Sequence, residues 1–388
     1  MAIEHKKGAN AGPVRQRAEG VVEAIRAERP GAQELTVRTV PDDPAGKVER
    51  RPALNLIALT GRAKAGDRVL LNTVAVELGL GTGGLDFIIA NLDSPLEERF
   101  APGHILKLRY TPLQTPVLAV CAPESPHHPA LRETVSLEEY PVVCAELHSQ
   151  VPVICAAARW ALQEFGWSRA PRIAYIMTDG ASLPLALSRL VPELKARGWV
   201  DATLTAGQAF GGDYEAVNLY SALAAARAVV QADIIVVSQG PGNVGTQTPL
   251  GFSGVDQGLA VNAAASLGGI PIAVARISFA DPRDRHQGLS HHTVTVLSTI
   301  ARAPALVPIP RLPAPQMKAV RAACVQSGIT KEHEVITVDA ERGLAAFEAS
   351  GLDVTTMGRT LDQERPFFLA AAAAGLLAAQ LVEFREEF

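Results

Sequence analysis

Apolar runs and helix-like stretches alternate along the second half of the chain. Between Pro141 and Pro310 an apolar run ends five times in a polar loop, and a stretch with helical spacing follows each loop. Near-continuous apolar strands that alternate with amphipathic helices predict a parallel sheet covered on both faces. In such a sheet the loops emerge at the carboxyl ends of the strands, where ligands bind. The five loops are 145–150, 177–182, 205–213, 238–254 and 276–292.

The first part of the chain has a different pattern. From about Glu19 to about Pro123, short apolar runs recur at regular spacing with turn residues between them. This spacing predicts a small barrel or sandwich. The run HILKLRY carries Lys107 and Arg109, which we expect to be solvated strand residues.

Together the two patterns predict an α/β fold class with two domains. A polar arm (1–18) precedes a small N-terminal β-barrel or sandwich domain (19–123). A doubly wound, mostly parallel, Rossmann-like α/β domain (124–388) follows. The pattern indicates a Pro-rich hinge near 310–315 and an Ala-rich terminal helix at 366–384.

The Ala-rich helix is nearly long enough to cross a membrane. Most of its residues are Ala, which is only weakly apolar, so we expect no membrane insertion. Small side chains let backbones approach closely, and we expect a tightly packed helix at a subunit interface of a homo-oligomer.

Composition narrows the class of protein. Of 388 residues, 48% are hydrophobic and 20% are charged, which is typical of a soluble globular chain. A net charge of −4 without a basic run gives no reason to expect a nucleic-acid or membrane partner. The cysteines are isolated from one another, so we expect neither a disulfide framework nor a zinc site built on them. The N-terminus lacks an apolar signal segment, and we expect a cytoplasmic protein.

The fourth loop is rich in glycine. Gly240, Gly242 and Gly245 spell G-x-G-x-x-G, but nine residues, TQTPLGFSG, separate the third glycine from the next helical stretch. The dinucleotide fingerprint needs a helix that opens at that glycine, so NAD(P) is disfavoured and the sequence names no cofactor. We expect backbone N–H groups and the hydroxyls of Thr246 and Thr248 to hold a carboxylate or phosphate. A long structural loop remains the alternative.

The fifth loop is the densest polar cluster. Ser290 occupies the expected N-cap position, which puts His291 and His292 in the first turn of a helix. The positive end of a helix dipole disfavours imidazolium, so both histidines should tend towards the neutral form. Neutral imidazole suits a base or a metal ligand, and Arg276 would offset the charge of an anion.

No metal-ligand set is assigned from the sequence. A site that combines His286 with Asp281 or Asp284 is an alternative, although the spacing fits no standard zinc pattern. Pairing of aspartate with arginine, which would simply hold the loop, is the competing explanation.

The remaining strand ends supply further candidates. Thr178 and Asp179 end one strand, and because Ser182 is expected to cap the following helix, Asp179 is free to act as an acid, base or ligand. Asp213 has two possible roles, a catalytic one and the N-cap of its helix. His148 lies at the end of the first strand. The candidate catalytic residues are Asp179, His148, His291, His292 and Asp213. The candidate ligand-binding residues are Gly240, Gly242, Gly245, Thr246, Thr248, Arg276 and Thr178.

Several long segments carry a family resemblance. They are GLGTGG, GHILKLRYTPLQ, ESPHH, MTDGASLPLALSRL, GPGNVGTQTPLGFSG and ISFADPRDRHQGLSHHT. In order and spelling they resemble a bacterial family, domain-of-unknown-function family 3866, over most of residues 19–310. The resemblance implies a cytoplasmic bacterial protein and brings no substrate and no residue roles.

The leading functional hypothesis is an enzyme that acts on a small anionic metabolite, phosphorylated or carboxylate, at the carboxyl ends of the parallel strands. One alternative is a non-catalytic sensor that binds a nucleotide or another metabolite. The other is an oligomeric assembly protein. Convergent, unpaired polar side chains in one pocket favour the enzyme, a site made only of backbone groups favours the sensor, and a filled cleft favours assembly.

Overall fold

The computed structural model describes residues 16–41, 47–80, 83–94, 103–133, 136–167, 169 and 171–386. Most of the predicted arm at 1–18 lies outside these residues. The chain divides into two compact units. The first consists of Met1–Ala101 and Tyr110–Thr115, and the second of Pro102–Arg109 and Pro116–Phe388.

The first unit contains the predicted barrel, which is closed and has the strand order β1-β2-β3-β5-β4. Its elements are β1 (Arg17–Arg29), β2 (Ala32–Thr39), β3 (Arg50–Leu56), α1 (Ile57–Thr60), β4 (Arg68–Asn72), α2 (Val74–Glu77) and β5 (Asp86–Asn91). Strands β3 and β5 pair in parallel and the other pairs are antiparallel, an arrangement of the five-stranded OB-fold type. Alternate side chains such as Val22, Leu35 and Val69 fill the interior.

The run HILKLRY does not supply a barrel strand. Its β6 (Ile105–Lys107) pairs with β7 (Thr115–Val117) in a separate two-stranded sheet. Lys107 is fully buried rather than solvated, so that expectation is wrong. Its Nζ donates to the carbonyl oxygens of Gly207 (2.9 Å) and Ala209 (2.8 Å), and lies 3.3 Å from a carboxylate oxygen of Glu215. A buried ammonium needs such partners, and burial lowers its pKa.

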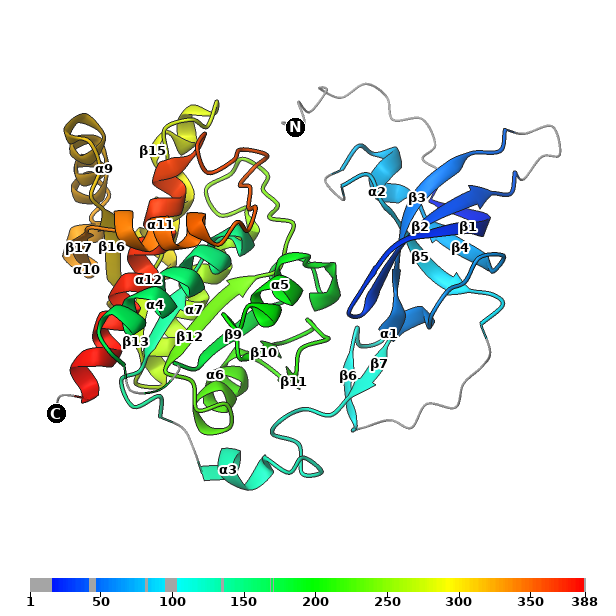
Figure 1. The fold of residues 1–388 in the computed structure, drawn as a ribbon, viewed down its shortest axis with the longest axis horizontal. Coiled ribbons are helices and arrows are strands. Elements are labelled where there is room, and N and C mark those ends of the chain that lie inside the picture. Colours follow the sequence, from blue (N-terminus) through cyan, green and yellow to red (C-terminus); the bar gives the residue numbers. More distant parts are fainter. Residues whose placement is uncertain are drawn as a thin grey trace. The chain divides into compact units, whose positions relative to one another are not determined.

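The second unit is built on an eight-stranded sheet in which every pair is parallel (Figure 1). The strand order is β11-β10-β9-β12-β8-β13-β16-β17, which confirms the predicted α/β fold class. The strands are β8 (Pro141–Cys144), β9 (Ile173–Thr178), β10 (Ala202–Thr205), β11 (Tyr214–Glu215), β12 (Ile234–Gln239), β13 (Ile270–Ala273), β16 (Leu306–Pro310) and β17 (Glu334–Val338).

Helices cover the sheet on both sides. Their bounds are α3 (His128–Glu133), α4 (Val151–Glu164), α5 (Leu190–Ala196), α6 (Leu219–Ala228), α7 (Asp256–Ser266), α8 (His291–Thr295), α9 (Ala314–Gln326), α10 (Ile329–Glu332), α11 (Glu341–Ala349) and α12 (Arg365–Glu386). Helices α4, α11 and α12 pack together on one face. Right-handed crossovers place α6 and α7, which also pack together, on the other.

The order of the strands contains a topological switch point. From β8 the chain passes through α4 towards β9 on one side, whereas from β13 it passes through α8 towards β16 on the other. Strands β8 and β13 are neighbours, so the loops that leave the carboxyl ends of these two strands run in opposite directions and leave a crevice between them. Such a crevice is the usual ligand site of an open α/β sheet.

Helix α12 is part of the core of this unit. Among the described helices it alone is long and apolar enough to cross a membrane, yet 78% of its apolar window is buried inside the protein. It packs against α4, β8 and β16 of the same unit. At Gly375 a β-carbon would lie 2.3 Å from the carbonyl oxygen of Ile154, so the two helices approach each other more closely than a larger side chain allows.

We expect Gly375→Ala to destabilise the α/β unit by about 1–3 kcal/mol, because overpacking outweighs the roughly 1 kcal/mol that Ala gains in helix propensity. Urea unfolding followed by tryptophan fluorescence measures this change, since Trp160, Trp167 and Trp199 all lie in this unit. Gln380→Ala, at an exposed position of α12, is the matched control and should change stability by less than about 0.5 kcal/mol. A more stable Gly375→Ala variant would contradict the close helix contact.

Candidate functional site

Two loops meet at the switch point through a buried acidic residue. Glu146 follows β8, and Arg276 and His292 belong to the segment after β13. Glu146 Oε1 lies 2.6 Å from His292 Nδ1 and 3.2 Å from Arg276 Nη1, and the Glu146 side chain is fully buried. Oε2 of Glu146 is also buried and has no hydrogen-bond partner among the described residues.

The charge of Glu146 is set by its two partners. Burial alone would raise the pKa of this carboxyl, but the Arg276 guanidinium and the His292 imidazole outweigh burial and lower the pKa. Glu146 is therefore ionised and accepts hydrogen bonds. Arg276 Nη1 also lies 3.3 Å from His292 Nδ1, and since both atoms can carry protons we assign the Nδ1 proton to the shorter contact with Glu146.

A short hairpin positions the rest of the site. The strands β14 (Ile277–Ser278) and β15 (Gly288–Leu289) pair antiparallel and bring Ser290 back beside Arg276, with a 2.9 Å backbone hydrogen bond. Ser290 caps α8 as predicted, because its Oγ accepts from the backbone N–H of His292 at 3.2 Å. The same Oγ lies 2.7 Å from Nδ1 of His286.

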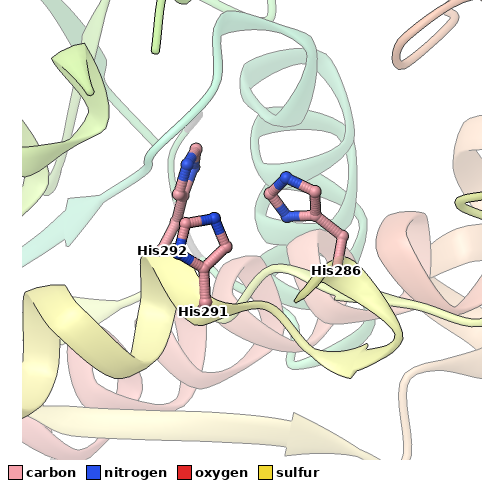
Figure 2. Close-up of side chains that lie close together, drawn as sticks. All are labelled: His286, His291 and His292. Carbon is pink, nitrogen blue, oxygen red and sulfur yellow. The ribbon is translucent and has the colours of Figure 1, made fainter. Parts of the chain in front are cut away.

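Three histidines converge beside this hairpin (Figure 2). His286, His291 and His292 each present one ring nitrogen, and these nitrogens lie within 4.8 Å of one another. Phe252, from the Gly-rich loop, stacks on His292 with ring centroids 3.8 Å apart. Nε2 of His291 is buried and has no hydrogen-bond partner among the described residues.

The surroundings keep at least two of these rings neutral. Burial, followed by the nearby Arg276 and Arg283 guanidinium groups, lowers the pKa of His286 to about 3. Burial and the neighbouring His292 lower the pKa of His291 to about 4. Burial is thus the main cause, rather than the helix dipole that the sequence suggested. At neutral pH each ring has one nitrogen lone pair free to accept a proton or bind a metal.

The three histidines line a small pocket together with arginines. Arg276, Arg283 and Arg285 lie in its wall, and Arg285 is exposed. The Gly-rich loop and the segment after α11 complete the wall through Asn243, Val244, Gly245, Gln247, Thr248, Phe252 and Met357. The pocket thus combines proton-accepting imidazoles with positive charge, and Glu146 lies behind its wall, bound to Arg276 and His292.

A family model matches most of the chain. The model described as "Protein of unknown function (DUF3866)" covers residues 52–375, which is most of the chain. This chain belongs to the DUF3866 family. No curated protein and no solved structure matches it. The match therefore identifies relatives and leaves the function to be inferred from the site.

The glycine-rich loop contributes part of the DUF3866 pocket. Gly245 and Thr248 line the pocket, whereas Gly240 and Gly242 line a neighbouring one. The hydroxyls of Thr246 and Thr248 lie 3.1 Å apart, and that of Thr246 also donates to the Gly251 carbonyl, so both already help to fold the loop. Gly242 has φ +99°, a backbone conformation that favours glycine, and a β-carbon there would meet no atom within 4 Å among the described residues.

The aspartates and the threonine at strand ends β9 and β10 do not reach this pocket. Among the described residues, Asp179, Thr178 and Asp213 are absent from its wall. Asp179 is exposed and accepts from the backbone N–H of Gln208 at 2.8 Å. The hydroxyl of Thr178 donates to the Asp256 carboxylate.

Two predicted helix caps are wrong. Asp213 accepts from the backbone N–H of Thr203 at 2.8 Å and thereby ties the start of β11 to β10, while Asn218 caps α6. Ser188, rather than Ser182, accepts from the first backbone N–H groups of α5. In both cases the helix begins later than the sequence pattern suggested.

His148 lies in a different network. Its Nδ1 is 2.9 Å from the hydroxyl of Tyr175 and its Nε2 is 2.7 Å from Oγ of Ser188. Both ring nitrogens are therefore used inside the protein. His148 and Gly242 line the neighbouring pocket, which shares Asn243 and Met357 with the pocket of the three histidines.

The predicted pairing of Asp281 with His286 as metal ligands is not what the geometry favours. Asp281 is buried and lies 2.7 Å from Arg283 and 3.0 Å from Arg359. These guanidinium groups hold its pKa well below the usual range against the effect of burial. Asp281 therefore anchors the loop, as the competing explanation proposed.

Sequence reasoning missed Glu146 altogether. The candidate in the same loop was His148, because histidine is a common catalytic residue type. The available signal was position: Glu146 is the charged residue closest to the end of a fully apolar strand. A carboxylate directly after a buried strand is itself buried unless the chain leaves the core immediately. A buried carboxylate needs a cation or a hydrogen-bond donor beside it, so its position predicts such a partner.

His148 predicts a pH dependence of stability. Burial lowers its pKa to about 4, whereas the unfolded value is about 6.5. The unfolded chain therefore takes up this proton first as the pH falls. The contribution of His148 to stability is complete above about pH 6.5, and about 3 kcal/mol of it is lost by about pH 4.

In the His148→Gln variant the free energy of unfolding should therefore fall less between neutral pH and about pH 4 than it does in the wild type. Urea unfolding of wild type and variant at pH 7.0 and 4.5, with a smaller loss of stability in the variant, checks the prediction. Equal losses in both proteins would show that His148 is charged in the folded state.

Proposed function

We propose that this DUF3866 protein is an enzyme that acts on a small anionic metabolite in the pocket of the three histidines. One observation carries the proposal. At the switch point of the parallel sheet, a buried carboxylate and a histidine ring each have an atom without a hydrogen-bond partner in the described part of the chain. Oε2 of Glu146 and Nε2 of His291 are both buried without a hydrogen-bond partner among the described residues. An unsatisfied buried polar atom costs about 1–3 kcal/mol, and a ligand that pairs with it removes that cost.

The Glu146–His292 pair supports proton transfer. A carboxylate that accepts a hydrogen bond from Nδ1–H fixes the ring, and in the neutral ring the lone pair is then on Nε2, which is the arrangement of an oriented general base. Here the Nδ1–Oε1 distance is 2.6 Å. No described residue hydrogen-bonds to Nε2 of His292. That nitrogen is therefore available to a substrate or a metal ion.

The arginines support an anionic substrate. Arg276 neutralises Glu146, and Arg283 pairs with Asp281 at 2.7 Å. Arg285 lines the pocket and has no hydrogen bond or ion pair with any described residue, so its charge is left for a ligand. The space open to water in the pocket is about 80 Å³, which suits a phosphate or carboxylate group rather than a whole nucleotide.

The two alternatives predict other sites. A sensor that held its ligand by backbone groups alone would not need buried, unpaired side-chain atoms. An assembly protein would fill the crevice, whereas here polar side chains line an open one. Both remain outcomes of the test below.

Replacing Arg285 tests the anion site. We expect inorganic phosphate or a small dicarboxylate to raise the melting temperature of the wild type, and Arg285→Gln to weaken that binding about 10- to 100-fold, because a charge-assisted hydrogen bond contributes about 1.5–3 kcal/mol. Thermal shift over a concentration series measures both. Arg302→Gln, an exposed position outside the pocket, is the matched control and should bind as the wild type does.

Turnover then separates an enzyme from a sensor. Each anion that binds is incubated with the protein and followed by NMR for conversion. Binding without conversion of any compound would favour the sensor. A wild type that responds to no anion, or an Arg285→Gln variant that binds as tightly, would overturn the proposed site.

A further inference from the structure

The three histidines have the donor set of a metal centre. Their ring nitrogens lie within 4.8 Å of one another, on side chains from a single loop and the helix that follows it (Figure 2). In a tetrahedral site with bonds of 2.0–2.1 Å, ligand nitrogens are about 3.3 Å apart. Rotations of the imidazole rings about their side-chain bonds would close the difference, because the three rings are close neighbours with centroids 4.4–4.9 Å apart.

Two of the histidines are held in the orientation that metal ligands need. Nδ1 of His292 is fixed by the Glu146 carboxylate at 2.6 Å, and Nδ1 of His286 by Oγ of Ser290 at 2.7 Å. Histidine ligands almost always donate their second ring N–H to a carboxylate or another acceptor, which directs the free lone pair at the metal. The lone pairs of His286 and His292 are then on Nε2, where neither has a hydrogen bond to a described residue.

The third histidine supplies an independent observation. Nε2 of His291 is buried without a partner among the described residues. A ligand that accepts the lone pair of this nitrogen removes the cost of leaving it unsatisfied.

We propose that His286, His291 and His292 bind one divalent transition-metal ion of the zinc class. Three imidazoles favour Zn²⁺, Co²⁺ or Ni²⁺ over Mg²⁺ and Ca²⁺, which take oxygen ligands. Three protein ligands leave a fourth position open to water or to an oxygen of a ligand in the pocket. That last role rests on the proposed function, whereas the metal site itself does not.

Carboxylates balance all but one of the arginine charges described near the site. Glu146 offsets Arg276, and Asp281 offsets Arg283 and Arg359. Only Arg285 in the pocket wall is left without a described partner. An anion that bound the metal at the fourth position would therefore also lie beside an unpaired guanidinium.

Direct metal titration tests the proposal. The untagged full-length chain is stripped with a chelator and titrated with Co²⁺ and then Zn²⁺ alone, without any substrate. We expect one ion per chain, visible absorption bands typical of tetrahedral Co²⁺ with nitrogen ligands, and displacement of Co²⁺ by Zn²⁺. Less than one ion per chain, or the spectrum of hexaaqua Co²⁺, would overturn the site.

Variants assign the ligands. His286→Gln and His291→Gln should each weaken Zn²⁺ binding at least 100-fold, and Glu146→Gln about 10- to 100-fold, the range seen when the partner of a ligating histidine is removed. His104→Gln, at an exposed histidine outside the cluster, should bind Zn²⁺ as the wild type does. Equal affinity in all four variants would place the ion elsewhere.

A measurement on the wild type covers the case of a variant that does not fold. X-ray absorption at the zinc edge of the loaded protein should show three imidazole ligands at about 2.0–2.1 Å. Sulfur ligands or an all-oxygen shell would contradict the assignment. If an anion stabilises the metal-free protein but no metal binds, the metal site is wrong and the proposed function stands. If a metal binds but no anion stabilises the protein, the metal site stands and the proposed function is wrong.

Discussion

The buried carboxylate of Glu146 is the constraint on which the site depends. A carboxylate in the interior is stable only if a cation and hydrogen-bond donors compensate for the lost water. Both described partners, Arg276 and His292, come from the segment after β13, more than 100 residues further along the chain. That segment must therefore close over the carboxyl end of β8. Its closure fixes His286 and His291 as well, because Ser290 connects them to the same hairpin.

The last part of the α/β unit depends on the same closure. Asp281 holds Arg359, and Arg359 in turn binds Glu364 just before α12. Met357, from the same segment, lies in the walls of both pockets. Residues far apart in sequence thus enclose one crevice. The Ala-rich helix that follows is held in the core by its close contact with α4 rather than exposed to lipid.

Much of the fold could be predicted from the sequence. Short apolar runs at regular spacing, with turn residues between them, predicted the barrel, and apolar runs followed by helical spacing predicted the parallel sheet. The pattern also indicated the edge where Arg276, His291 and His292 meet. It failed where burial depends on tertiary partners: Lys107 is polar in a short strand, but four backbone carbonyls enclose it.

The candidate site was predicted only in part, for a physical reason. All loops at the carboxyl edge of a sheet share one edge, but an eight-stranded sheet is too wide for one pocket, and strand order decides which loops are neighbours. Asp179 and Asp213 follow β9 and β10, away from the switch point, so they serve local hydrogen bonds. Glu146 follows β8 itself. Its role depends on β8 lying next to β13, which periodicity does not reveal.

The position of one proton tests the account most directly. If Glu146 orients His292, the proton of the neutral ring lies on Nδ1 and the lone pair on Nε2. Long-range ¹H–¹⁵N NMR of the histidine-labelled, metal-free protein distinguishes the two tautomers, and the His292→Gln variant assigns the signal. The account predicts a proton on Nδ1. An unprotonated Nδ1 with the proton on Nε2 would mean that Glu146 does not hold this ring, and the proposed site would lose its orienting carboxylate.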